Sequence, residues 1–203
     1  NDAIDAAGIK HKGESVWLAE ALVRSLKVLA QLCEVDGREQ KAKKYQRMAK
    51  TMTDRINKHA WDGQWYVRGF DDQGDVYGSK KEKEGKVYLN SQSWAFLADI
   101  VPPRRKKKIL KAVDKYLNGE HGLALFHPAY SSWVKRLGRI SMFSEGTKEN
   151  AAVFCHAATF MAVAYAVLGE GDKAYEAMRR IMPAAQKDME LYKTEPYVFA
   201  EYL

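Results

Sequence analysis

The amino-acid sequence predicts an all-α fold, a toroid of αα-hairpins. Apolar residues recur at the helical period through most of the 203 residues. Small Ala and Gly residues on these segments allow close helix packing, and the connections are unequal, polar and rich in aromatic residues. An α-solenoid would repeat a self-similar unit of roughly 34–47 residues. The sequence shows no such repeat, so the toroid is preferred.

The first predicted hairpin joins a helix over residues 14–33 to a helix over residues 39–59. The Asp36-Gly37 pair breaks the helical pattern between them. Two helices with so short a connection are expected to lie antiparallel. The first helix carries a broad apolar face, made of Trp17, Ala21, Leu22, Val28, Leu29 and Leu32.

Residues 61–90 are rich in Gly, Asp and aromatic side chains, unlike the helices on either side. Residues 65–70 have the composition of a short strand, and Gln73-Gly74 is a turn dipeptide. This segment therefore predicts a short β-hairpin-like insertion. The charged residues 80–86 predict a surface loop.

A third helix is predicted over about residues 90–100, with Asn90 and Ser91 as candidate N-caps. Pro102 ends this helix. Pro103 suits the first turn of a fourth helix, because the N–H that proline lacks has no helical partner there.

Residues 118–150 form a long segment with little periodicity, and loops of this length in a compact domain are usually functional. An Ala-rich fifth helix is predicted over residues 150–168, and a sixth with Asp172 as its N-cap. Pro196 is placed to open a seventh helix. That helix would be cut at Leu203, so we expect more protein to follow.

Two basic clusters, residues 41–50 and 104–108, account for much of the formal net charge of +7. Apolar residues accompany both at helical spacing, which favours solvated helix faces over a nucleic-acid surface. No zinc-finger, RNP or helix-turn-helix signature accompanies them. No apolar run approaches the roughly 18–20 residues of a membrane span, and no signal peptide opens the chain. We therefore expect neither nucleic acid nor membrane as a partner.

The sequence contains two cysteines, Cys33 and Cys155, each in an apolar, helix-like context. Two cysteines provide no disulfide framework for a chain of this length. We expect two buried free thiols, which favours a cytoplasmic location.

Four segments combine polar groups with aromatic residues: 1–5, 61–72, 146–156 and 195–201. Carbohydrate sites have this composition, because aromatic faces stack on sugar C–H surfaces while carboxylates and amides bind the hydroxyls. Helix capping and loop chemistry explain any one segment equally well. On composition alone the two interpretations are balanced.

Motifs within these segments and between them resemble the catalytic domain of glycoside hydrolase family 94, in that family's order and over essentially the whole chain. The family contains cellobiose, cellodextrin, laminaribiose and chitobiose phosphorylases. No single motif is specific, but together they are. They are Asn1-Asp2-Ala3-Ile4-Asp5, Gly13-Glu14-Ser15-Val16-Trp17-Leu18-Ala19, Trp61-Asp62-Gly63, Trp65-Tyr66, Gly78-Ser79, Glu84-Gly85-Lys86, Leu89-Asn90-Ser91-Gln92-Ser93-Trp94-Ala95, Gly138-Arg139-Ile140, Gly146-Thr147-Lys148-Glu149-Asn150, Val153-Phe154-Cys155-His156-Ala157 and Glu195-Pro196-Tyr197-Val198.

The resemblance implies that residues 1–203 are the C-terminal portion of a single (α/α)6-barrel catalytic domain. The family's N-terminal β-sandwich, its earlier barrel helices and the Trp that precedes the Asn1-Asp2 motif are absent from this sequence. Its phosphate loop is expected after Leu203, and its donor-sugar arginines before Asn1. The chain alone is therefore expected to be inactive.

The resemblance also implies a reaction: inverting phosphorolysis of a β-linked glucose-type disaccharide or oligosaccharide to an α-sugar 1-phosphate. Phosphate replaces the water and general base of an inverting hydrolase, so one protein carboxylic acid suffices. Asp2 matches the family's general acid and would protonate the glycosidic oxygen. Without the resemblance, a helix cap or loop hydrogen bond would be the preferred role for Asp2.

Five further residues are candidates from the same resemblance. His156 matches a phosphate-binding histidine, the alternative being a core histidine in an Ala-rich helix. Lys148 and Glu149 match residues that line the acceptor sugar, the alternative being a charged pair at a helix start. Glu201 lies where family members carry a polar residue, often Gln, near donor sugar and phosphate. Arg139 either faces the acceptor or forms a structural ion pair.

Three other functions stay open at this point. A second possibility is the phosphorylase-like domain of a cyclic glucan synthase. An inverting hydrolase would need a second carboxylate about 6.5–9.5 Å from the acid, for which Glu149 or Glu201 would serve. A non-enzymatic helical scaffold would leave Asp2, Glu149 and His156 far apart.

No metal or organic cofactor is expected, since the five histidines lack ligand spacing and phosphate is a co-substrate. The expected partners are a β-linked saccharide and phosphate. The resemblance is compatible with a homodimer. The residues do not distinguish cellobiose, cellodextrin, laminaribiose and chitobiose as the sugar.

Overall fold

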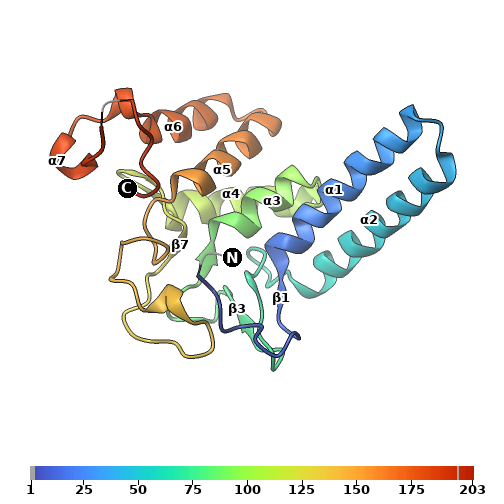
Figure 1. Ribbon diagram of the computed structural model, residues 1–203, viewed down its shortest axis with the longest axis horizontal. Coiled ribbons are helices and arrows are strands. Elements are labelled where there is room, and N and C mark those ends of the chain that lie inside the picture. The colour runs from blue at the N-terminus through green and yellow to red at the C-terminus, as the bar shows by residue number, and fades with distance from the viewer. Residues whose placement is uncertain (1–2, 196) are drawn as a thin grey trace.

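The computed structural model of the protein describes residues 3–195 and 197–203. About half of the described chain is helical, and six helices of at least nine residues dominate it (Figure 1). The helices agree with the predicted helical class. Their bounds are Val16–Val35 for α1, Glu39–His59 for α2, Leu89–Leu97 for α3, Pro103–Tyr116 for α4, Cys155–Val167 for α5 and Gly171–Ile181 for α6, followed by the short α7, Met189–Tyr192.

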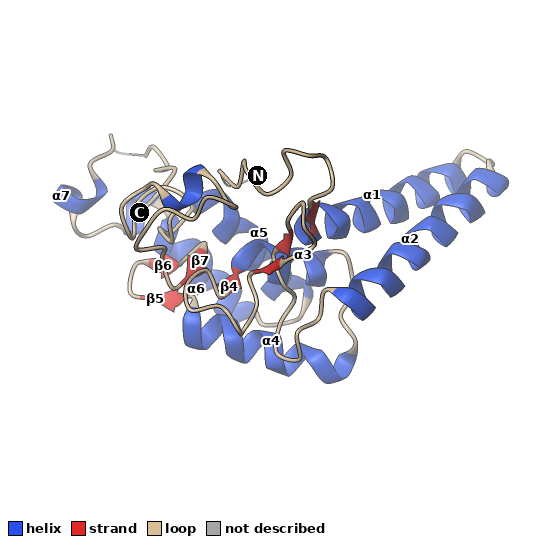
Figure 2. Cartoon of the chain, turned by 90° about the horizontal axis from the view of Figure 1, so that it is seen from below, coloured by secondary structure: helices blue, strands red, loops and turns tan. Residues whose placement is uncertain are grey.

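The helices are arranged in two sets. Helices α1, α3 and α5 form a central row, in which α3 contacts both α1 and α5. Helices α2, α4 and α6 are flanking helices, each in contact with the central helix that precedes it in the chain (Figure 2). Alternation of central and flanking helices is the arrangement expected of αα-hairpins.

Helix α1 begins two residues later than predicted, because Glu14–Ser15 forms strand β1. The Oγ of Ser15 accepts a hydrogen bond from the backbone N–H of Leu18, 3.4 Å away, and so caps the helix. Helix α2 has the predicted bounds. It begins without a side-chain cap, so packing against α1 rather than capping must fix its start.

The predicted apolar face of α1 is largely wrong. Leu22 and Leu29 are each 43% exposed and Leu32 is 59% exposed. Helix α1 has apolar residues on most of its circumference, so periodicity alone did not distinguish the face that contacts α2 and α3. The buried residues of α1 are Val16, Glu20, Val23, Leu26 and Ala30.

Within the described residues, seven two-residue strands form three small antiparallel sheets. Strand β2, Gly69–Phe70, pairs with both β1 and β3, Val76–Tyr77. The β2–β3 turn, where the N–H of Gly74 bonds the carbonyl of Asp71, is the predicted hairpin-like insertion, although its strand is shorter than predicted. The other two pairs are β4, Val87–Tyr88, with β7, Phe126–His127, and β5, Asn118–Gly119, with β6, Gly122–Leu123.

The predicted N-caps of α3 are wrong, since Asn90 and Ser91 lie inside its first turn and are buried. Tyr88 occupies the N-cap position without a side-chain cap bond. All of α3 except Trp94 is buried, so its polar first turn is enclosed by neighbouring elements. Helix α4 begins at Pro103 as predicted.

Helix α5 begins five residues later than predicted, at Cys155. Residues 150–154 instead form a turn that leads into a short extended stretch, in which Val153 and Leu203 exchange two backbone hydrogen bonds of 3.0 and 2.9 Å. The same pairing shows that the predicted seventh helix is wrong over residues 197–203. Pro196 lies outside the described residues. Glu170, not the predicted Asp172, precedes α6 as its N-cap residue.

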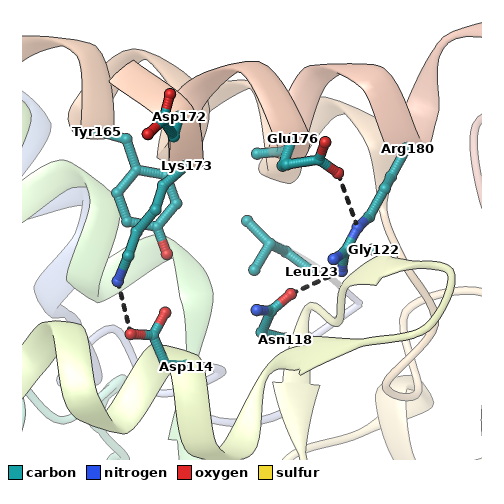
Figure 3. A pocket seen from close by; sticks show the side chains of 10 residues that line it. Asp114, Asn118, Gly122, Leu123, Tyr165, Asp172, Lys173, Glu176 and Arg180 are labelled. Carbon is teal, nitrogen blue, oxygen red and sulfur yellow. Dashed lines mark hydrogen bonds and ion pairs between the residues drawn. The ribbon is translucent and has the colours of Figure 1, made fainter. Parts of the chain in front are cut away.

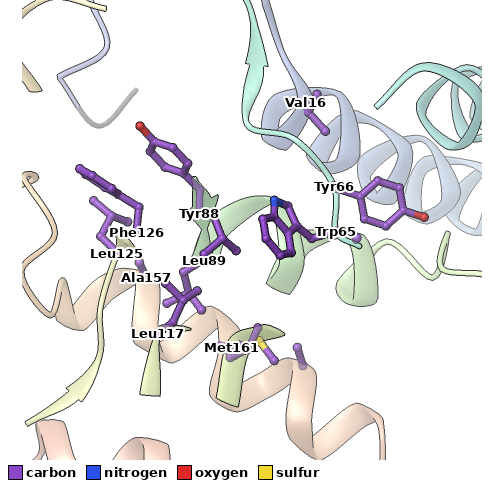
Figure 4. Packing of buried hydrophobic residues seen from close by; sticks show 14 of the residues in the cluster. Val16, Trp65, Tyr66, Tyr88, Leu89, Leu117, Leu125, Phe126, Ala157 and Met161 are labelled. Atoms are coloured by element: carbon purple, nitrogen blue, oxygen red, sulfur yellow. The ribbon is translucent and has the colours of Figure 1, made fainter. Parts of the chain in front are cut away.

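The core joins all the central helices to the loops that lead into them (Figure 4). Tyr66, Tyr88 and Phe126 are at most 1% exposed and fill the space between the loops and α3. Cys33 and Cys155 are free thiols as predicted, but only Cys155 is buried. No helix within the described ranges is both long and apolar enough to span a membrane.

Candidate functional site

The candidate site lies around the N-terminal end of α5. The loops that lead into α1, α3 and α5 gather on one side of the molecule, below the helices in Figure 1. Residues 118–154 make up the longest of these loops. All of the predicted site residues that the structure describes lie on this loop, at the start of α5, or on the C-terminal segment that pairs with it.

His156 is the second residue of α5, and its side chain is exposed, so the alternative of a core histidine is wrong. The imidazole lies between two aromatic rings. Its centroid is 5.6 Å from that of Phe154 and 4.5 Å from that of Phe160. An exposed imidazole at a helix N-terminus is well placed to donate a hydrogen bond to an anion.

Glu201 is brought to the same place by backbone pairing. The N–H of Cys155 donates to the carbonyl of Glu201 at 3.0 Å, and the rings of Phe154 and Tyr202 stack at 4.8 Å. Glu201 is therefore directly across from the first residue of α5, with an exposed side chain. The structure thus brings together His156 and Glu201, which are 45 positions apart in the sequence.

Lys148 and Glu149 lie in a tight turn rather than at a helix start, so the helix-start alternative is wrong. Lys148 has a positive φ of 47°, and its ammonium is 5.2 Å from the centroid of Phe143. The turn is held by Asn150, a fully buried residue. Its amide donates to the carbonyl of Phe143 at 2.7 Å, and its oxygen accepts from the N–H of Tyr130 at 2.9 Å.

Arg139 forms the ion pair that was one of its two predicted roles. The Nε of its guanidinium lies 2.5 Å from one carboxylate oxygen of Asp5, and its backbone N–H donates to the other oxygen at 2.9 Å. The hydrogen bond from the backbone N–H of Arg139 is the main cause that lowers the pKa of Asp5. Gly138 has a φ of 91°, and a Cβ there would collide with the Asp5 carboxylate. The rest of the guanidinium is exposed enough to reach a ligand.

Asp2, the candidate acid, lies outside the described residues. The chain that follows it is fixed to the site loop. The carbonyl of Ala3 accepts from the N–H of Ile140 at 3.0 Å, and the N–H of Ala6 donates to Leu137 at 3.3 Å. Residues 3–6 therefore lie against the same loop that carries Arg139, Lys148 and Glu149.

The N-terminal ends of α1, α3 and α5 lie on this side of the molecule (Figure 1). All residues of α1, α3 and α5 are described, and none of their first turns contains an acidic side chain. The unpaired N–H groups and the macrodipole of each helix favour a negative charge at such an end. These helix ends favour an anion, while Glu201 brings one carboxylate to the start of α5.

Two buried charged residues next to the site were not predicted. Arg68 is fully buried, donates from Nη1 to the Oγ of Ser15 at 2.9 Å, and lies 5.3 Å from the centroid of Trp17. Glu20 is also fully buried, and this burial raises its pKa well above the usual range, an effect that the charge of Arg68 only partly offsets. The spacing of Glu20 with Val16 and Val23 on one helical face was the available sequence signal.

A separate pocket of about 210 Å³ lies between α4, α6 and the β5–β6 turn (Figure 3). Its two cations, Lys173 and Arg180, each have a partner within the pocket. Lys173 is 2.6 Å from Asp114, and Arg180 donates to Asn118 at 2.8 Å. This pocket is lined mainly by α4, α6 and the β5–β6 turn, with Tyr165 of α5, and contains none of the predicted site residues. Over the described ranges, no group of three or more His, Cys, Asp or Glu side chains is arranged to hold a metal ion.

Comparison with known proteins identifies one family over the full length. The sequence model of the glycosyl hydrolase 94 superfamily, catalytic domain, matches residues 1–203. The chain is 38% identical over 90% of its length to a 3-O-beta-D-glucopyranosyl-beta-D-glucuronide phosphorylase of Paenibacillus borealis. It is 36% identical over 90% of its length to a cellobionic acid phosphorylase of Neurospora crassa, and 32% identical over 100% to an N,N'-diacetylchitobiose phosphorylase of Vibrio furnissii.

The chain spans about a quarter of the length of these relatives: 24%, 23% and 25%. Among solved structures, a sialidase resembles the fold with a TM-score of 0.66, over 94% of this chain and 17% of that one. The identity to the sialidase is 13%, so this likeness concerns the fold alone.

Proposed function

Because this chain belongs to the catalytic-domain family of the glycosyl hydrolase 94 superfamily, we propose that it forms part of an inverting β-glycoside phosphorylase. The reaction transfers the donor sugar of a β-linked disaccharide or oligosaccharide to inorganic phosphate, giving an α-sugar 1-phosphate and the shortened sugar. The observation that carries this proposal is the family match over residues 1–203, and the pairing of Glu201 with Cys155, next to the exposed His156 at the start of α5, supports it.

Asp2 is proposed as the general acid that protonates the leaving glycosidic oxygen. Phosphate then attacks the anomeric carbon from the opposite face, so no second carboxylate is needed to activate water. His156 is proposed to donate a hydrogen bond to a phosphate oxygen. Its exposure and its position in the first turn of α5 support this role.

The turn that carries Lys148 and Glu149 is proposed to line the acceptor sugar. The ammonium of Lys148 would donate to sugar hydroxyls and the carboxylate of Glu149 would accept from them. Anchoring of this turn by the buried Asn150 supports the assignment, because a sugar site needs a rigid frame. Glu201 is proposed to bond a donor-sugar hydroxyl, since its carboxylate would otherwise repel phosphate.

The helix arrangement is proposed to be half of an (α/α)6 barrel, with α1, α3 and α5 as inner helices and α2, α4 and α6 as outer helices. The chain spans about a quarter of its relatives, and we propose that the remaining site residues lie on the rest of the protein. Residues 1–203 alone are accordingly expected to be inactive. Phosphorolysis by the purified chain unaided would contradict this division of the site.

The acceptor is proposed to be an acidic sugar, and one observation supports this choice over a neutral acceptor. Arg139 keeps most of its guanidinium exposed while Asp5 fixes the Nε side. Two of the relatives are named for a glucuronide and for cellobionic acid, both of which carry a carboxylate. A guanidinium recognises a carboxylate through two parallel hydrogen bonds.

The test uses the full-length protein, a panel of β-linked disaccharides with neutral or acidic acceptors, and inorganic phosphate. We expect phosphate-dependent release of an α-sugar 1-phosphate, which the Asp2→Asn substitution abolishes. Sugar release without phosphate, or full activity of the Asp2→Asn variant, would contradict phosphorolysis. Equal kcat/KM on neutral and acidic acceptors would contradict only the acidic-acceptor assignment.

A further inference from the structure

The imidazole of His156 is exposed to solvent but restricted by aromatic rings. The ring of Phe160 contacts it with an interplanar angle of 57°, and the ring of Phe154 with an angle of 74°. Phe154 is itself stacked on Tyr202, with centroids 4.8 Å apart. An exposed histidine side chain normally samples several rotamers, and contacts on two sides reduce that freedom.

Phe160 is supported in turn by two tryptophans of the neighbouring central helices. Its centroid lies 5.2 Å from that of Trp94 on α3 and 6.4 Å from that of Trp17 on α1. Phe160 is four residues after His156, so the two side chains share one face of α5. The three central helices α1, α3 and α5 thus each contribute one aromatic ring to a wall behind His156. We call Trp17, Trp94 and Phe160 the aromatic wall.

The far end of the aromatic wall is also fixed. The guanidinium of Arg68 lies over the ring of Trp17 at 5.3 Å and donates to the Oγ of Ser15 at 2.9 Å. Ser15 is the N-cap of α1. Ring contacts therefore run without interruption from the start of α1 to the start of α5.

We propose that Phe160, supported by Trp17 and Trp94, is a positioning residue that holds the His156 imidazole in its phosphate-binding orientation. This rests on the proposed phosphorolysis, in which His156 contacts phosphate. A ligand group that is ordered in advance loses less rotamer freedom on binding, and the affinity rises accordingly. One aromatic pair changes an equilibrium constant by about two- to twelvefold, which sets the size of the effect.

The experiment measures steady-state kinetics of the full-length protein with inorganic phosphate and with the sugar varied separately. Phe160→Leu removes the ring but retains an apolar side chain of similar volume. We expect the KM for phosphate to rise about tenfold. The KM for the sugar should change little, because the aromatic wall stands behind the proposed phosphate ligand only. Phe160→Tyr retains the ring and should restore the KM for phosphate.

The matched control is Phe96→Leu. Phe96 lies on α3, is 4% exposed, and makes no ring contact with another described aromatic residue. Both Phe→Leu variants should lower Tm, but only Phe160→Leu should raise the KM for phosphate. An unchanged KM for phosphate in Phe160→Leu, or the same rise in Phe96→Leu, would overturn the positioning role.

If Phe160→Leu does not fold, Trp94→Leu removes one support of Phe160 and leaves α5 unchanged. A raised KM for phosphate in Trp94→Leu supports the proposal, and an unchanged one overturns it. If the unsubstituted protein shows no phosphorolysis, the proposed function fails instead, which the same assay detects before any variant is compared.

Discussion

The central helices and the flanking helices differ in the charged residues at their ends and in the polar side chains that they bury. The flanking helices α2 and α6 carry Glu39 and Asp172 in their first turns and basic residues in their last turns, as the helix dipole favours. The central helices α1, α3 and α5, all of whose residues are described, have no acidic residue in a first turn. They also bury polar side chains, among them Glu20 and Asn90.

This difference indicates where stability and function lie in the molecule. The flanking helices α2 and α6 place charges at their ends that suit the helix dipole, whereas α4 has a basic residue in its last turn but no acidic residue in its first. The central helices have no acidic side chain in their first turns and bury polar side chains, at some cost in stability. Sites that break local folding rules are the expected places for ligand binding.

The largest effect is expected at the start of a central helix. His156→Ala should lower kcat/KM for phosphate by about a thousandfold, because a preorganised donor to the reacting anion is lost. The matched control is His59→Ala, an exposed histidine at the end of flanking helix α2, which should retain full activity. Steady-state kinetics of the full-length protein provide the measurement. Equal losses in both variants would break the distinction between the two sets of helices.

A core substitution in a flanking helix should lower stability and leave catalysis unchanged. Ile109 on α4 is fully buried, and Ile109→Ala should lower the free energy of unfolding by about 2–5 kcal/mol through cavity formation. Below the lowered Tm, kcat should stay unchanged. Urea unfolding followed by circular dichroism measures the first quantity, with Lys107→Ala on the exposed face as the control. A large loss of kcat in the folded Ile109→Ala protein would contradict a purely structural role for α4.

Replacing the buried carboxyl of Glu20 should raise the stability of the protein, whereas Ile109→Ala should lower it. Burial raises its pKa, so its favourable contribution is present below its unfolded pKa and is lost as pH rises through the folded pKa. Glu20→Gln removes the ionisation and should raise Tm at pH 7, with little effect near pH 4. Thermal scans of both proteins between pH 4 and pH 8 measure this. A lower Tm for Glu20→Gln at pH 7 would show that the ionised form is stabilising through Arg68.

The smallest effect is expected from an exposed carboxylate. Asp72 accepts hydrogen bonds from the N–H groups of Lys10, Lys12 and Gly13, and the first of these is the main cause that lowers its pKa. A lowered folded pKa gives stability that is present above the unfolded pKa and lost as pH falls through the folded value. The loss of Tm below about pH 4 should therefore be steeper in the parent than in Asp72→Asn. Parallel curves would indicate that the bonds do not survive in solution.

Much of the fold could be predicted from periodicity. Helix α2 has the predicted bounds and α4 the predicted start, because charged and apolar residues alternate on them at the helical period. The central helices were harder to predict. Helix α1 is apolar on most sides, and the start of α5 depends on pairing with Leu203, which no local pattern reveals. Non-local contacts therefore account for most of the boundary errors.

The candidate site was predicted by family motifs rather than by periodicity. Those motifs located His156 and Glu201, and backbone pairing through Cys155 and Leu203 brings the two together. The residues that support the site were missed. The contacts of Phe160 with Trp17 and Trp94 join three separate helices, so only the three-dimensional structure reveals them.

The anomeric form of the first product tests the central claim most directly. The full-length protein is mixed with a β-linked disaccharide and inorganic phosphate, and the products are followed by NMR before mutarotation. Phosphorolysis predicts an α-sugar 1-phosphate that forms only when phosphate is present, with none from Asp2→Asn. A free sugar released at the same rate with or without phosphate would contradict the account, because it would require a water-activating base at this site.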